Sequence, residues 1–254
     1  MQSELYDLHA EIELKHWWFV GRRQIMRNIL NTALPPDRNR FVVDIGCGTG
    51  ANIAALADDY SVLGIDTSEK AIEYAKQRFP NTHYVCGHAP RDLDGDFAHA
   101  DAILLMDVLE HIEDPASVLG PLVETLSPGG VVLITVPADM RLWSVHDENF
   151  GHYRRYDIQS IREVWQSMPV TEVVTSYFNS RLYPIARLAR TVSRMRSKSW
   201  GKSGSDLSVP PGPANRMLEN IFASESTRLL DAMQGNKAGY RRGVSLISIL
   251  RKQG

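Results

Sequence analysis

The sequence contains few cysteines, no long uncharged apolar stretch and no pronounced excess of charge of either sign. Its two cysteines, Cys47 and Cys86, are too few for a disulfide framework or for a metal site of their own. The eight histidines show no spacing typical of metal ligands, so the sequence predicts no metal site. No apolar run approaches the ~18 residues of a membrane-spanning helix, and residues 1–4 do not begin a secretory signal. We therefore expect a cytoplasmic protein.

Charge is nevertheless distributed unevenly along the chain. The net charge of −2 indicates no particular partner, but the stretch from Arg181 to Lys202 holds basic residues and no acidic one. The basic residues are Arg181, Arg187, Arg190, Arg194, Arg196, Lys198 and Lys202. A helix predicted over residues 182–198 would place apolar side chains on one face and arginines largely opposite. Such a helix suits an anionic substrate, peripheral contact with an anionic membrane, or plain docking with a solvated basic face.

Short apolar runs alternate with helix-length segments from about residue 40. The predicted strands are residues 41–45, 61–66, 82–86, 102–106, 131–136, 170–178 and 243–251. The predicted helices are residues 50–59, 69–79, a segment from about Pro115 that closes at 127–130, 182–198 and 214–233. This alternation favours a mostly parallel sheet covered on both faces. We expect seven strands, with the last inserted antiparallel beside the strand at 170–178.

A glycine-rich segment, Asp44-Ile45-Gly46-Cys47-Gly48-Thr49-Gly50, ends the first predicted strand. Glycines there let the backbone approach a ligand closely and start a helix. By pattern alone the segment also satisfies a dinucleotide fingerprint. Asp44 would repel a pyrophosphate, however, and suits a ligand that bears an ammonium group. Asp66 ends the next strand, where an acid can accept hydrogen bonds from both hydroxyls of a ribose.

The glycine segment is one of four that together resemble the class I S-adenosylmethionine-dependent methyltransferases. In chain order they are residues 42–50, 64–66, 107–115 and 126–130. The resemblance implies a Rossmann-like α/β fold, a seven-stranded mostly parallel sheet with an antiparallel last strand, and S-adenosylmethionine (SAM) as cofactor. The product would be S-adenosylhomocysteine (SAH).

The resemblance also implies where the cofactor binds. Gly46 and Gly48 would line its methionine part, the region around His88 would border the adenine, and Met106 and Asp107 the sulfur. Many relatives have an acid where His88 stands, and a neutral imidazole can also accept a hydrogen bond. The complete set of expected cofactor-binding residues is Trp18, Arg22, Asp44, Gly46, Cys47, Gly48, Asp66, Thr67, His88, Ala89, Met106 and Asp107.

Two flanking segments, residues 16–23 and 151–156, resemble a bacterial branch of these enzymes that often acts in natural-product or surface-glycan pathways. In the first, a predicted helix with Trp18 and Arg22 could close over the cofactor and place an arginine on the methionine carboxylate. It could equally dock on the sheet. The expected organisation is an N-terminal helical lid (1–39), a SAM-binding core (40–180 and 236–254) and a helical cap insertion (181–235).

Methyl transfer is an in-line displacement that requires alignment of the reactants and exclusion of water. A hydroxyl or protonated amine acceptor must also lose a proton, and histidine suits that task near neutral pH. The candidate bases are His111, His146 and His152. The candidate substrate-binding residues, in the segment after the fifth strand, are Arg154, Arg155 and Tyr156. Alternatively, an ion pair between an arginine and Asp147 or Asp157 pins this segment.

The favoured function is O- or N-methylation of a small, possibly anionic acceptor by a monomer or homodimer. An RNA methyltransferase is an alternative, with the basic helix on phosphates, but residues 107–110 lack the Pro-Pro-aromatic tetrad of enzymes that methylate base amino groups. A non-catalytic SAM-binding protein would not need the polar groups that follow Val136. A dehydrogenase is disfavoured by Asp44.

Overall fold

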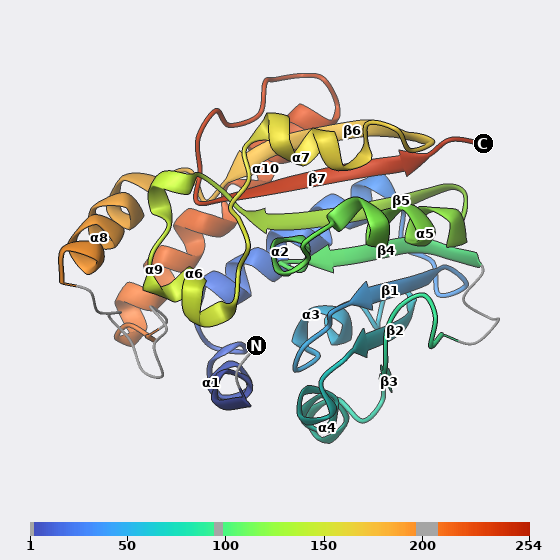
Figure 1. Cartoon of the computed structure of the whole chain (residues 1–254), viewed down its shortest axis with the longest axis horizontal. Helices are drawn as coiled ribbons and strands as arrows, with labels where there is room; N and C mark the ends of the chain where they lie inside the picture. The colour runs from blue at the N-terminus through green and yellow to red at the C-terminus, as the bar shows by residue number, and fades with distance from the viewer. Residues whose placement is uncertain (1–2, 94–98, 197–207) are drawn as a thin grey trace.

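The structure is a computed structural model that describes residues 3–93, 99–196 and 208–254 (Figure 1). Its centre is one seven-stranded sheet with the strand order β3-β2-β1-β4-β5-β7-β6. The strands are β1 (Phe41–Ile45), β2 (Ser61–Asp66), β3 (His83–Cys86), β4 (Ala100–Met106), β5 (Leu126–Pro137), β6 (Val170–Phe178) and β7 (Ser245–Lys252). β7 is antiparallel to both β5 and β6, and the other pairs are parallel. The expected Rossmann-like sheet with an inserted antiparallel last strand is confirmed.

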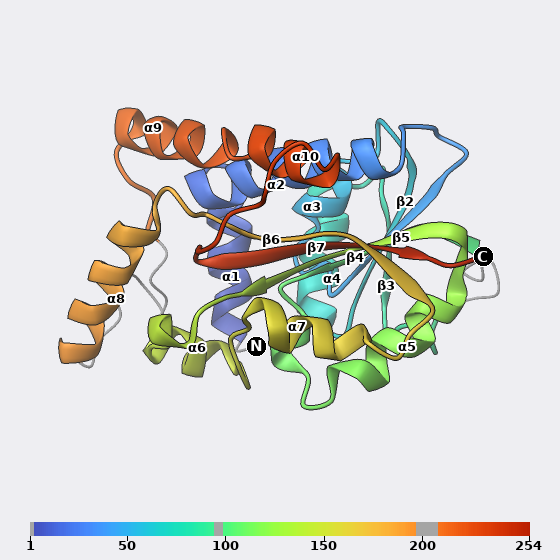
Figure 2. The ribbon, with the colours of Figure 1, turned by 90° about the horizontal axis from the view of Figure 1, so that it is seen from above.

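Helices cover both faces of this sheet (Figure 2). The helices are α1 (Ser3–Ile12), α2 (Trp17–Ala33), α3 (Ala51–Ala54), α4 (Glu69–Arg78), α5 (Pro115–Thr125), α6 (Val145–Phe150), α7 (Ile158–Trp165), α8 (Tyr183–Arg196), α9 (Gly212–Ala223) and α10 (Ser226–Met233). Short 3₁₀ turns lie at η2 (Leu109–His111) and η3 (Met140–Leu142). α2, α3, α4, α9 and α10 pack on one face, and α5 and α7 on the other. Among the described residues, no helix combines the length and apolar character needed to span a membrane.

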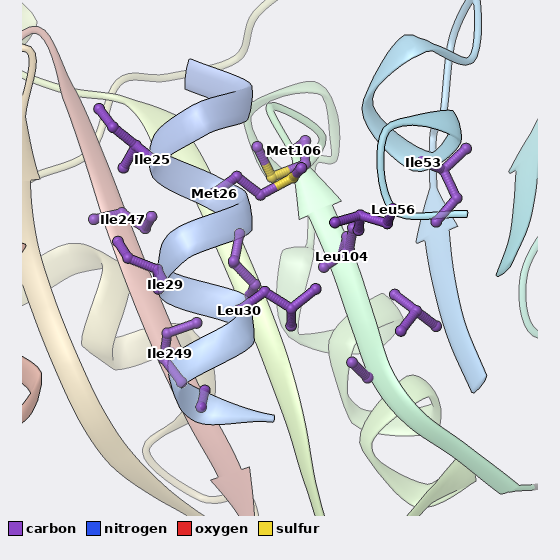
Figure 3. Packing of buried hydrophobic residues seen from close by; sticks show 14 of the residues in the cluster. Ile25, Met26, Ile29, Leu30, Ile53, Leu56, Leu104, Met106, Ile247 and Ile249 are labelled. Carbon is purple, nitrogen blue, oxygen red and sulfur yellow. The ribbon is translucent and has the colours of Figure 1, made fainter. Parts of the chain in front are cut away.

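Packing on both faces explains why the central strands consist of apolar runs. Val42 of β1 belongs to the core under α2, whereas its neighbour Val43 belongs to the core under α5. Successive strand residues face opposite sides, so a strand covered on both sides must be apolar throughout. On the α2 side, the helix lies along β4, β5 and β7 and places a row of large side chains against them (Figure 3). Labelled there are Ile25, Met26, Ile29, Leu30, Leu104, Met106, Ile247 and Ile249.

Several boundaries differ from the sequence prediction. α3 ends at Ala54 rather than near residue 59, because the chain turns there to enter β2. β5 begins at Leu126 rather than Val131, because residues 127–130 bulge out between two paired positions. α7 was not predicted. The helix predicted over 214–233 is two helices.

The break between α9 and α10 has a specific cause. Glu225, at the break, is fully buried, and one of its oxygens accepts hydrogen bonds from the backbone amides of Ser180 and Arg181, both at 2.8 Å. These bonds tie the break to the chain after β6. α9 and α10 pack along α2. Phe222 of α9 also stacks on Phe178 at the end of β6, with ring centroids 5.8 Å apart. The cap function expected for residues 181–235 stays a prediction.

α8 leaves its apolar side chains open rather than docked. Ile185 and Leu188 are 64% and 68% exposed. The hydroxyl of Tyr183, the first residue of α8, donates to Asp139. Further along the helix, Arg190 contacts Ser144. Plain docking of its apolar face on the described part of the chain is thus wrong. Lys198 and Lys202 of the basic stretch lie outside the described residues.

Candidate cofactor and acceptor site

The glycine segment forms a turn between β1 and α3. Gly46, Gly48 and Gly50 have φ of 70°, 55° and 91°, the left-handed region that glycine adopts without strain. The amides of Gly46 and Cys47 donate to the carbonyl of Ile65, at 2.8 and 3.0 Å, and hold the turn against β2. A Cβ atom on Gly48 would meet nothing within 4 Å. The backbone at Gly48 is therefore open to a ligand.

Asp44 lies on β1 directly before this turn and is completely buried. Neither of its carboxylate oxygens has a hydrogen-bond partner. Burial raises the pKa of Asp44 to about 8, although Arg22 opposes the shift. A buried carboxylate without a partner is costly, and an ammonium group from a ligand would satisfy it. The role of Asp44 as the partner of a ligand's ammonium group stays a prediction.

Asp66 lies at the carboxyl end of β2, beside the turn. Its two oxygens accept hydrogen bonds from the amides of Gly48 and Ser68, each at 2.9 Å. Burial raises the pKa of Asp66, and these amides oppose the rise. Each carboxylate oxygen can accept a second bond, so both remain competent for the two ribose hydroxyls. Tyr6 of α1 lies close to Asp66. Burial is the main cause that raises the pKa of Tyr6, and the negative charge of Asp66 is the second.

Arg22 of α2 does not point into open space. Its guanidinium pairs with Asp107 and lies 4.3 Å from the centre of the Trp18 ring. Asp107, with φ of 59°, also accepts a hydrogen bond from the Thr135 hydroxyl at 3.1 Å. A methionine carboxylate could reach Arg22 only in competition with Asp107. The predicted contact is therefore not preformed, and Trp18 and Arg22 instead join α2 to the end of β4.

The N-terminal helices lie across the glycine turn. Glu13, just after α1, accepts a 2.6 Å hydrogen bond from the Thr49 hydroxyl and pairs with Arg78. Asp7 on α1 pairs with Lys70 of α4 at 2.6 Å. These contacts join residues 3–33 to both sides of the expected cofactor site. Sequence reasoning named neither Glu13 nor Asp7, and its assignment of residues 1–39 as a lid stays a prediction.

The expected adenine region follows β3. His88 is exposed, and its amide donates to Asp92 at 2.8 Å. Ala89 is half-buried, and Thr67 on the neighbouring strand end is exposed. Asp92 thus places a carboxylate beside His88, in the region expected to border the adenine. In the sequence, only its closeness to His88 could have marked Asp92 as a candidate site residue.

The three candidate bases gather on the other side of the site. The rings of His111 and His152 are 4.7 Å apart, and His146 packs on Phe150 with centroids 4.3 Å apart. Burial lowers the pKa of His111 to about 4, and burial also lowers the pKa of His146 well below its usual range. His152 Nδ1 lies 3.0 Å from Asp147 Oδ1. A histidine oriented by a carboxylate has the geometry of a general base, which favours His152.

Asp147 organises the loop that carries His152. It is fully buried and holds Arg155 Nε at 2.8 Å, Arg190 at 3.6 Å and the Ser144 amide at 2.9 Å. Burial acts to raise the pKa of Asp147, but His152 and the two arginines lower it below the usual range. The ion-pair network considered as the alternative from sequence is the one observed.

The predicted substrate-binding residues are accordingly engaged by the protein. Arg155 also donates to the Ala138 carbonyl at 3.0 Å, and Arg154 donates to the Glu113 carbonyl at 2.7 Å. The buried Tyr156 hydroxyl donates to the Leu109 carbonyl at 3.1 Å. The Tyr156 hydroxyl is thus used inside the core, and substrate contact through Tyr156 stays a prediction. Arg155 positions Asp147 instead of presenting a free guanidinium.

A cavity of about 360 Å³ adjoins this loop. It is lined by both signs of charge, with arginines in excess: Asp139, Arg141, Arg155, Asp157, Arg241 and Arg242, together with Met140, Tyr156, Tyr177 and Gly243. Arg141 is paired with Asp139 at 2.9 Å, whereas Arg241 and Arg242 are exposed. The volume falls within the range of small-molecule sites.

The sheet, the glycine turn and the two strand-end aspartates together define a class, and comparisons with known proteins agree. Residues 14–168, more than half of the chain, match a family described as a methyltransferase domain. The chain belongs to the class I S-adenosylmethionine-dependent methyltransferases.

Similar proteins extend this result. A trans-aconitate 2-methyltransferase of Deinococcus radiodurans is 38% identical over 125 residues, 48% of this chain and 47% of that protein. A ubiquinone biosynthesis O-methyltransferase of Paracidovorax citrulli is 29% identical over 141 residues, 53% of this chain and 54% of that protein. The chain thus spans about half the length of the curated relatives it matches.

Among solved structures, the N-methyltransferase NodS of Bradyrhizobium japonicum, in complex with SAH, has a TM-score of 0.55. The superposition covers 94% of this chain and 90% of that one at 15% identity, which shows a shared fold.

Proposed function

We propose that this chain transfers the methyl group of SAM to an oxygen or nitrogen atom of a small-molecule acceptor. The observation that carries the proposal is Asp44, a buried carboxylate without a partner, directly before an open glycine turn. An ammonium group is the natural partner for this carboxylate, and Asp66 offers ribose contacts on the next strand. A dinucleotide would bring a pyrophosphate instead, which Asp44 disfavours.

The chain's own residues would act by positioning and by moving one proton. When bound, SAM supplies a methyl group on a sulfonium that leaves as a neutral thioether. Asp44 would hold the ammonium group and Asp66 the ribose. Asp147 is ionised and can only accept, so His152 Nδ1 carries the proton and Nε2 is free to take one from the acceptor.

An anionic acceptor fits the charges near this loop. The 360 Å³ cavity has two exposed arginines, Arg241 and Arg242, in addition to the paired Arg141. Arg155 joins the cavity to Asp147 and hence to His152. Among the relatives, the name trans-aconitate 2-methyltransferase denotes a carboxylate acceptor and ubiquinone biosynthesis O-methyltransferase an oxygen acceptor. These names support a small acceptor over RNA.

The proposal is tested by incubating the full chain with methyl-labelled SAM and panels of small carboxylic acids, phenols, amines and RNA. We expect label in a small-molecule panel, and its loss in Asp66→Ala. Label in RNA alone would favour the nucleic-acid alternative. SAM binding with no transfer to any panel would favour a non-catalytic binding protein.

We further propose that the protein acts in the cytoplasm, as a monomer or homodimer, and that α8 contacts an anionic membrane surface. The support for membrane contact is the exposure of Ile185 and Leu188 on a helix that also carries the exposed Arg187. Basic amphipathic helices bind anionic lipid by this combination of apolar and cationic side chains.

A further inference from the structure

Three potential metal ligands converge beside the expected acceptor position. Among the described residues, Glu110, His111 and His152 each offer one ligand atom, and these atoms lie within 4.8 Å of one another. Glu110 and His111 belong to the η2 turn after β4, whereas His152 follows α6. The amide of Tyr153 donates to the Glu110 carbonyl at 2.8 Å and joins the two segments. The cluster is therefore held by backbone as well as by side chains.

Glu110 is the unusual member of this cluster. Its side chain is completely buried, and neither carboxylate oxygen has a hydrogen-bond partner. Buried carboxylates are normally hydrogen-bonded, paired with a charge or bound to a metal. The neighbouring charged groups do not form an ion pair with Glu110. Asp107 has the same charge and repels it, and Arg22 and Arg155 are both paired with other carboxylates. A cation at the cluster would satisfy Glu110.

His152 is already oriented as a ligand. Its Nδ1 donates to Asp147 at 3.0 Å, which leaves Nε2 as a lone-pair donor. Metal-bound histidines usually donate their other ring nitrogen to a carboxylate or carbonyl in this way. Asp147 is in turn fixed by Arg155 at 2.8 Å and by the Ser144 amide at 2.9 Å.

We propose that Glu110, His111 and His152 bind one first-row divalent cation such as Zn²⁺. Two imidazoles and one carboxylate with an open fourth position are a known catalytic zinc arrangement. Bonds of about 2.0–2.2 Å require ligand atoms roughly 3.4 Å apart. The donor atoms lie within 4.8 Å of one another, so cation binding requires them to approach by up to about 1.4 Å through side-chain rotation.

The cation would also give the acceptor a place, a step that rests on the proposed function. An acceptor hydroxyl or carboxylate oxygen could occupy the fourth position, where the cation lowers the pKa of the hydroxyl. The S–CH3 bond of SAM would then break as the bond from the methyl group to the acceptor oxygen forms, and SAH would leave as a neutral thioether. A hydroxyl acceptor would lose its proton to solvent, whereas a carboxylate acceptor has none to lose. With the cation bound, His152 Nε2 would hold the metal, and the lowered pKa of the hydroxyl would replace the base role proposed above for His152 in the metal-free chain.

The test is metal binding by the full chain after treatment with a chelator, without SAM or acceptor. Zn²⁺ is titrated by calorimetry and Co²⁺ by its visible absorption bands, which report the ligand geometry. We expect one ion per chain, and binding at least about 100-fold weaker in Glu110→Gln and in His152→Gln. His83→Gln, an exposed histidine on β3, is the matched control and should bind as the parent does.

Two results would overturn the site: no binding by the parent, or parent-like binding in a folded His152→Gln. Because Glu110→Gln changes a buried group, circular dichroism confirms its fold, and His152→Gln decides if that variant does not fold. SAH binding is measured separately on the same samples. Metal binding without SAH binding would support the cation site and refute the proposed function. SAH binding without metal binding would refute the cation site and leave the proposed function in place.

Discussion

Two buried acids, Asp44 on the cofactor side of the site and Asp147 on the acceptor side, differ in the groups that surround them. On the cofactor side, Asp44 is buried with no partner at all, beside an open turn. On the acceptor side, Asp147 is buried with two arginines, a histidine and a backbone amide around it. The first arrangement costs stability until a ligand arrives, whereas the second stabilises a loop without any ligand. The surroundings of Asp44 therefore indicate a ligand-binding site, and those of Asp147 indicate a structural ion-pair network.

Removal of Asp147 should have the largest effect on stability. Asp147→Ala leaves Arg155 of the loop and Arg190 of α8 without their carboxylate, and we expect a loss of about 3–5 kcal/mol in the free energy of unfolding. Chemical denaturation measures it, with the exposed Asp58→Ala as a control that should change stability by less than about 0.5 kcal/mol. An equally small loss in Asp147→Ala would mean that the network is not structural.

Substitution of His152 should have the largest effect on catalysis. His152→Ala should lower kcat by about 10²–10⁴, whether the imidazole takes the proton or holds a cation, while SAH affinity stays near that of the parent. His146→Ala should lower kcat less, because His146 packs on Phe150 and its pKa is strongly lowered by burial. Steady-state kinetics across pH compare the variants. Full activity in both His152→Ala and His146→Ala would leave His111 as the remaining candidate.

On the cofactor side, Asp66→Ala should weaken SAH binding by about 2–4 kcal/mol, because two hydrogen bonds to a charged acceptor are lost. Calorimetry measures the affinity, and Asp59→Ala serves as the control. Asp59 ends the turn before β2 but pairs with Arg27, away from the glycine turn. Unchanged affinity in folded Asp66→Ala would refute the ribose assignment.

Asp44 also predicts a pH dependence of opposite sign for binding and for stability. Its folded pKa of about 8 lies above the ordinary value of 3.8, so its contribution to stability falls as pH rises between these values. Ligand binding needs the ionised form, so SAH affinity should rise by up to tenfold per pH unit toward about pH 8. Calorimetry in buffers of different ionisation enthalpy should detect the released proton. A flat profile would contradict the pairing of Asp44 with an ammonium group.

The smallest expected effect concerns α8. Leu188→Ser should lower binding to vesicles of anionic lipid by a few-fold, because one exposed apolar side chain is lost. The free energy of unfolding should change by less than about 0.5 kcal/mol, since Leu188 is not packed. Vesicle co-sedimentation measures the binding, with neutral vesicles as the control. Absence of binding by the parent would contradict membrane contact.

The same contrast explains how far sequence reasoning reached. β1, β2 and the start of α4 at Glu69 were placed correctly because their signals are local: apolar runs, a glycine turn and, directly before α4, the Ser68 side chain, which accepts from the Ala71 amide. Asp44 and Asp66 were named for the same reason. The break before α10 was missed because Glu225 is bound by amides 44 and 45 residues away.

The acceptor side depends on contacts that no local pattern reveals. The pairing of Arg22 with Asp107 joins residues 85 positions apart. The sequence suggested that Arg155 could bind a substrate. The structure shows that Arg155 instead pairs with the buried Asp147. Glu110 lay within the segment that carried the family resemblance, yet its burial without a partner depends on the approach of residues 152 and 153. Ligand spacing along the chain therefore could not predict this cluster.

The most direct test of the account is calorimetric titration of the full chain with SAH and, separately, with NADH. If Asp44 and Asp66 form a site for an amino-acid-bearing nucleoside, SAH should bind one per chain and NADH should not bind measurably. Asp44→Asn, which keeps the shape but removes the charge, should weaken SAH binding by about 1.5–3 kcal/mol. Tight binding of NADH, or SAH affinity unchanged in folded Asp44→Asn, would contradict the central claim.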